Sequence, residues 1–172
     1  MPAEAADEVL LDTSVLVNFL VVRRIDLLRD HLHYRFAVTD HVRAEITEHY
    51  ADQLAQLENA LAVGWLREIP VTGPEELELF AELSASGRLG AGECSAMAVA
   101  VCRKLPLAID DKAARKRASA FNPAVKVLDT ETLMVSLIRE DRMSVAEADE
   151  IKDEWEKEHR FKLGFGSFAD RI

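Results

Sequence analysis

The stretch EVLLDTSVLVNFLV, residues 8–21, decides the fold class of this chain. Its first five residues form an apolar run that ends in an acid, which predicts a short buried strand over 8–12. The next residues begin with hydroxyl side chains, which suit the start of a helix, so a helix is expected over 13–21. A strand that leads directly into a helix is the repeating unit of an α/β fold.

The same alternation continues along the chain. Extended segments are expected over residues 35–40, 66–71, 105–110 and 124–129. Helices are predicted over residues 41–50, 52–62, 74–83, 89–105, 111–120, 130–140 and 145–160. Such alternation implies parallel strands joined by right-handed crossovers, so the carboxyl ends of the strands gather along one edge of the sheet.

The overall composition fits one compact domain. The chain has 172 residues, of which 49% are hydrophobic and 30% charged, enough for a real core. No apolar stretch is long enough for a membrane span and the first residues do not resemble a signal peptide, so we expect a soluble, cytoplasmic protein. The net charge of -10 argues against a broad basic face for nucleic acid. It does not exclude a nuclease, because carboxylates that bind metal count towards that charge.

Acidic side chains are predicted to converge at the carboxyl edge of the sheet. Asp12 follows the first strand and the pair Asp110–Asp111 follows a later one, so the parallel topology brings them to the same edge. Glu45 lies one turn into the helix after the second strand, and Glu93 lies in the first turn of a buried helix. Magnesium and manganese prefer such oxygen ligands, so the pattern predicts a site for Mg²⁺ or Mn²⁺.

Several of these acids also have simpler explanations. Asp12 could cap the helix that follows it, and Glu45 competes with Glu48 for the inward position. One of Asp110 and Asp111 is expected to cap the next helix while the other faces the metal. We choose Asp111 as the ligand and keep Asp110 as a secondary ligand. Together, however, several carboxylates without a cation would repel each other, an arrangement that makes little sense as structure alone.

One segment of the chain is distinctly basic. Between residues 103 and 117 there are six Lys or Arg side chains, namely Arg103, Lys104, Lys112, Arg115, Lys116 and Arg117. Lys112, Arg115 and Lys116 are expected near the edge where phosphate would arrive, so they are predicted to bind RNA. A solvated helix face is the alternative. Thr130, at the last strand-to-helix junction, is expected either to cap its helix or to orient a carboxylate or a water.

Four blocks of sequence resemble the successive motifs of PIN-domain nucleases, over roughly residues 8–140. These blocks are LLDTSVLVNF, VRAEI, LGAGECSAMAVA and AIDDKAARKRA. The resemblance implies a three-layer, Rossmann-like parallel sheet flanked by helices, a magnesium or manganese cofactor, and hydrolysis of RNA. Many members of the family are VapC-like toxins of type II toxin–antitoxin pairs, so an antitoxin protein is an expected partner.

The resemblance also assigns site residues. It makes Asp12, Glu45, Glu93 and Asp111 the four catalytic acids of the family. It further matches polar positions beside the first acid to Thr13 or Ser14 and to Asn18.

The chain continues for about thirty residues beyond the resemblance. Residues 141–172 are predicted to hold a helix that Ser144 caps and a tail that contains Phe161, Phe165 and Phe168. This region is expected to pack on the nuclease domain, on a second protomer in a homodimer, or on an antitoxin.

Two other functions compete with a metal-dependent ribonuclease. The first is a PIN-like domain with weak or lost turnover that serves as an RNA-binding or partner-binding subunit; the presence of all four acids disfavours it. The second is a different phosphoryl-transfer domain. A haloacid-type phosphatase needs a second Asp where Ser14 stands, and neither it nor a response-regulator receiver explains Glu45 and Glu93.

Overall fold

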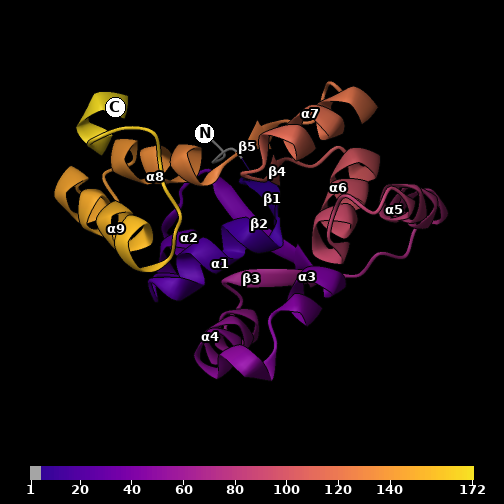
Figure 1. The fold of residues 1–172 in the computed structure, drawn as a ribbon, viewed down its shortest axis with the longest axis horizontal. Helices are drawn as coiled ribbons and strands as arrows, with labels where there is room; N and C mark the ends of the chain where they lie inside the picture. The colour runs from indigo at the N-terminus through magenta and orange to yellow at the C-terminus, as the bar shows by residue number, and fades with distance from the viewer. Residues whose placement is uncertain (1–4) are drawn as a thin grey trace.

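A computed structural model describes residues 5–172, and a central sheet separates two groups of helices (Figure 1). Its five strands are all parallel and lie in the order β3-β2-β1-β4-β5. Their bounds are β1 Asp7–Leu11, β2 Tyr34–Thr39, β3 Leu66–Ile69, β4 Leu107–Ala108 and β5 Val127–Leu128. This architecture confirms the predicted three-layer α/β fold with a parallel sheet.

The helices cover both faces of the sheet. Figure 1 shows α8 and α9 on one side of the sheet and α5 and α6 on the other. The α-helices are α1 Thr13–Val21, α2 Asp26–Asp30, α3 Asp40–Glu45, α4 Ala51–Ala62, α5 Pro74–Ala85, α6 Ala91–Arg103, α7 Lys112–Phe121, α8 Thr130–Arg139 and α9 Val145–Glu158. Short 3-10 turns form at Glu48–Tyr50 and Phe168–Arg171. No helix in residues 5–172 is long and apolar enough to cross a membrane.

The order of the strands reverses at β1, between β2 and β4. The chain first builds outwards from β1 through β2 to β3, and then crosses back so that β4 pairs with the other side of β1. Open α/β sheets place their functional sites at such a reversal, outside the carboxyl ends of the strands. The loops after β1 and β4 therefore lead directly into the position where Asp12 and the pair Asp110–Asp111 were expected.

The prediction for residues 41–50 was wrong in its extent. The helix α3 ends at Glu45, and Ile46 has an extended backbone with φ −90° and ψ 100°. Ile46 and Thr47 are β-branched and therefore weak helix formers, and the Ile46 side chain is buried in the core. Glu45 thus lies just over one turn from the start of its helix, as expected, but it is also the last residue of that helix. The sequence also gave no sign of the short helix α2.

The C-terminal region packs on its own domain. The Trp155 side chain of α9 is fully buried, and its Nε1 donates a hydrogen bond to the backbone oxygen of Asn18 over 2.6 Å. Phe161 lies edge-on against Trp155, and Phe168 is also fully buried. Asp149 holds the tail, because it accepts hydrogen bonds from the Phe168 amide and from a neighbouring serine hydroxyl.

Candidate active site

Asp12 lies at the carboxyl end of β1, where it is only 3% exposed. It occupies the N-cap position of α1, but its side chain makes no capping hydrogen bond. Burial, and after it the negative charge of Glu93, raise the pKa of Asp12 to about 7, although the amides of Thr13 and Ser14 act in the opposite direction. The carboxylate is therefore buried beside another acid without serving as an ordinary helix cap.

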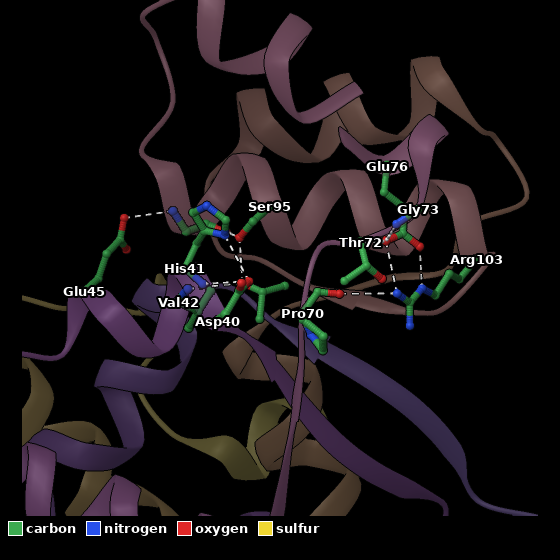
Figure 2. A network of polar contacts seen from close by, with 12 residues as sticks. Asp40, His41, Val42, Glu45, Pro70, Thr72, Gly73, Glu76, Ser95 and Arg103 are labelled. Carbon is green, nitrogen blue, oxygen red and sulfur yellow. Dashed lines mark hydrogen bonds and ion pairs between the residues drawn. The ribbon is translucent and has the colours of Figure 1, made fainter. Parts of the chain in front are cut away.

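Glu45 reaches across from the end of α3 to the start of α6 (Figure 2). Its Oε1 accepts a hydrogen bond from the Gly92 amide over 2.8 Å, and its Oε2 accepts one from the Thr13 hydroxyl. A Cβ at position 92 would lie 2.5 Å from Glu45 Oε2, so only glycine allows this approach. Thr13, expected beside the first acid, thus links α1 to the glutamate of α3.

Glu93 lies in the first turn of α6 and is close to three other acids. Burial raises its pKa, and the charges of Asp111 and Glu45 raise it further, while the backbone at Gly90 acts in the opposite direction. Glu93 in turn raises the pKa of Asp12. The structure therefore brings Glu93 together with Asp12, Asp111 and Glu45.

The two adjacent aspartates after β4 have different surroundings. Asp111 is the N-cap of α7, and its Oδ1 accepts a hydrogen bond from the Ala114 amide over 2.7 Å. Asp110 points towards α1 and α8, where Oδ1 accepts from the Thr130 amide over 2.8 Å. Its Oδ2 accepts from the Thr130 hydroxyl over 2.7 Å and from Asn18 Nδ2 over 3.0 Å. Asp111, expected to face the metal, is thus the capping member of the pair, although its Oδ2 accepts no hydrogen bond within residues 5–172. Both carboxylate oxygens of Asp110 accept hydrogen bonds.

Thr130 orients a carboxylate and does not cap its helix. The N-cap of α8 is Asp129, which accepts a hydrogen bond from the Thr132 amide. Burial raises the pKa of Asp110, whereas its hydrogen bonds from Thr130 lower it. Of the two roles expected for Thr130, the structure gives it the positioning role. Ser14 is exposed and contributes its amide near Asp12.

The carboxylates of this edge have no cationic partner among residues 5–172. None of the five acids that meet here forms an ion pair with Lys, Arg or His: Asp12, Glu45, Glu93, Asp110 and Asp111. Within the same range, no group of three or more His, Cys, Asp and Glu side chains could hold a metal ion as it stands. The negative charges are gathered at one edge, but several oxygens are directed at protein donors.

A comparison with family models decides the family of this chain. The model described as PIN domain (DUF3368) matches residues 8–158. The chain belongs to the PIN-domain family. PIN domains are in general nucleases, and they generally use divalent metal ions.

Two solved structures are similar to this chain at low sequence identity, and the one with a TM-score above 0.5 has the same fold. PAE2754 from Pyrobaculum aerophilum is 18% identical, with a TM-score of 0.51 over 81% of this chain and 94% of that chain. VapBC2 from Rickettsia felis, solved bound to a DNA fragment from its promoter, is 17% identical, with a TM-score of 0.49 over 71% of this chain and 98% of that chain. None of the curated proteins matches the sequence.

The basic side chains between residues 103 and 117 do not all face the same surface of this PIN domain. Arg103 forms an ion pair with the buried Glu76, whose pKa it lowers, and these two residues join α5 to α6 (Figure 2). Arg115 forms an ion pair with Asp129 over 2.7 Å, so it is held within the fold. The helix face that carries Lys112, Arg115 and Lys116 lines an open cavity together with Ser119 and Val127.

Sequence reasoning missed several residues at this edge. Arg88 and Arg117 line a cavity beside Glu93 and Asp111. Arg88 lies in a turn where no periodicity distinguishes it, although Arg117 belongs to the basic segment. Asp129 also ends a predicted strand with an acid, which is the signal that identified Asp12, and it could have been found in the same way.

Proposed function

We propose that this PIN domain is a divalent-metal-dependent endoribonuclease that hydrolyses RNA phosphodiester bonds in the cytoplasm. The observation that supports the proposal most strongly is the group of acids around Glu93, which lies at the carboxyl edge of the sheet and forms no ion pair within residues 5–172. A structural role alone does not account for like charges held together in this way.

The chemistry of these acids suits a divalent cation, although within residues 5–172 no three of them are arranged to hold one without movement of their side chains. Asp12, Glu93 and Asp111 would hold it, with Asp110 in a secondary position, because they offer hard oxygens at one site. Asp12 has a raised pKa and forms no ion pair within residues 5–172, and a bound cation would offset both its burial and the charge of Glu93. When bound, the cation supplies an activated water and a positive charge for the departing oxygen.

Other side chains would position these ligands. The Thr130 hydroxyl and Asn18 Nδ2 hold Asp110, and Asn18 also donates to the Thr130 hydroxyl over 3.1 Å. Glu45, the second acid of the family pattern, would fix the distance between the start of α1 and the start of α6 through Thr13 and the Gly92 amide. Glu45 would contribute to catalysis only if one of its carboxylate oxygens gave up its hydrogen bond to Thr13 or to the Gly92 amide.

The RNA strand and a protein partner complete the proposal. Lys112 and Lys116 would contact the phosphate backbone outside the reacting site, and Arg115 would join them by exchanging its ion pair with Asp129 for a phosphate. The resemblance of the motif blocks to VapC-like toxins suggests that an antitoxin protein binds this chain and that a homodimer forms. Expression of the chain alone should then stop cell growth, and co-expression of the antitoxin should restore it.

The test is cleavage of a single-stranded RNA by the purified protein. We expect cleavage with added Mg²⁺ or Mn²⁺, loss of cleavage with EDTA, and loss by orders of magnitude in the Glu93→Gln variant. Asp153→Asn is a matched control, because Asp153 is an exposed acid on α9. Cleavage at full rate in chelator would refute the metal mechanism, and RNA binding without cleavage would favour the alternative of an RNA-binding subunit.

A further inference from the structure

Two arginines share a cavity with two of the clustered acids. The cavity has a volume of about 340 Å³, and Arg88, Arg117, Glu93 and Asp111 all contribute to its lining. Arg88 lies in the turn between α5 and α6, and Arg117 lies on α7. The rest of the lining is apolar. This volume falls at the lower end of the range for small-ligand sites, so it suits a unit the size of a nucleotide.

Neither guanidinium group has a hydrogen-bonding or ionic partner among the described residues. Within residues 5–172, neither Arg88 nor Arg117 forms an ion pair, and neither side chain makes a hydrogen bond. Arg115 on the same helix differs, because Asp129 holds it. Two unpaired arginines on one cavity beside the carboxylates indicate a ligand with negative charge.

We propose that Arg88 and Arg117 bind a phosphate group of the RNA strand next to the reacting phosphodiester; this inference rests on the proposed function. The planar N–H groups of a guanidinium match the oxygens of a phosphate and can bind two of them at once. The carboxylates on the same cavity repel phosphate, and the arginines supply the opposing charge on the side where the strand enters.

This phosphate site is separate from the other basic face of α7. Lys112, Arg115 and Lys116 line a different cavity, with Val127, on another side of the helix. Arg88 and Arg117 therefore determine how the strand lies across Glu93, whereas the other basic face adds contacts further away. Loss of either arginine should weaken RNA binding without removing a metal ligand.

The experiment measures the binding of a fluorescein-labelled single-stranded oligoribonucleotide by anisotropy, in EDTA, at several salt concentrations. Arg88→Gln and Arg117→Gln should each raise Kd roughly tenfold, because each removes a charge-assisted contact. Each should also lower the slope of log Kd against log salt by about 0.7, the value for one phosphate contact to a single strand. Manganese should raise the melting temperature of both variants as much as that of the wild type.

The matched control is Arg142→Gln, because Arg142 is an exposed arginine in the turn between α8 and α9 that also lacks an ion pair among the described residues. It should bind RNA as the wild type does. The variant that carries both Arg88→Gln and Arg117→Gln separates the two proposals. If it keeps the wild-type Kd and salt slope while the wild type still cleaves RNA, only this inference fails. If the wild type neither binds nor cleaves RNA, the proposed function fails as well. Unchanged RNA binding with lost binding of polyglutamate would assign the site to an acidic protein partner instead.

Discussion

The Asp12→Asn substitution should stabilise the metal-free protein, and the size of the gain should depend on pH. The folded protein raises the pKa of Asp12 from 3.8 to about 7, first through burial and then through Glu93. At 1.36 kcal/mol per pKa unit, ionised Asp12 costs the folded state up to about 4 kcal/mol. Asparagine has the same shape without the charge, so it removes this cost.

The sign of the effect follows from the order of the two pKa values. Below the unfolded pKa of 3.8 the carboxyl is protonated in both states, so Asp12→Asn should change stability little. As the pH rises from about 4 to 7, the unfolded state loses its proton first, and the wild type becomes progressively less stable than the variant. Above about pH 7 the difference should reach its full size.

Urea denaturation in EDTA at pH 4, 6 and 8 measures this difference directly. The matched control is Asp149→Asn, because Asp149 accepts hydrogen bonds from the Phe168 amide and the Ser167 hydroxyl over 2.8 and 2.6 Å. This control should lose about 1 kcal/mol or more at pH 8. With manganese, the wild type should gain more stability than Asp12→Asn does. An Asp12→Asn variant that is less stable than the wild type at pH 8 and keeps the full manganese effect would refute the assignment of Asp12 as a metal ligand.

Two further predictions concern the residues that hold the acids in place. Gly92→Ala should displace the Glu45 carboxylate, lower stability by about 1–3 kcal/mol and reduce RNA cleavage, as urea melts and cleavage assays would reveal; Gly166→Ala, whose Cβ meets nothing within 4 Å, should change neither. Thr130→Val should lower the free energy of unfolding by about 1–3 kcal/mol. It should also raise the pKa of Asp110, which would shift the pH profile of cleavage. Thr130→Ser keeps the hydroxyl, so it should leave both the stability and the pH profile unchanged. Equal behaviour of Thr130→Val and Thr130→Ser would show that the hydroxyl does not position the carboxylate.

Most of the fold could be predicted because most strands lie in largely apolar runs that end at polar residues; β3, with the sequence LREI, is the exception. Even β4 and β5, with two residues each, were indicated by the runs that contain them. The end of α3 could not be predicted, because the helical pattern continues through Ile46 and only the packing of that side chain in the core breaks it. The short helix α2 has no periodic pattern to detect, since it has one buried turn.

The candidate site was predictable as a set of acids but not as a set of contacts. The parallel topology alone places the acids after β1 and β4 at the same edge. Which of Asp110 and Asp111 caps α7 depends on the direction of the chain after β4, and two adjacent residues of the same type give no sign of it. The contribution of Arg88 depends on a turn between two helices, which a pattern of hydrophobic residues does not locate in space.

The C-terminal helix contributes to the same edge of the sheet, although it lies more than a hundred residues from Asn18. Trp155 is fully buried and donates to the backbone oxygen of Asn18, while the Asn18 side chain donates to Asp110. A single residue of α1 therefore connects α9 to an acid of the candidate site. Because a buried hydrogen bond without its donor leaves an unsatisfied carbonyl, removal of α9 would cost the support of α1 as well as apolar burial. The match of the PIN-domain model through residue 158 agrees with this packing, since it extends to the last residue of α9.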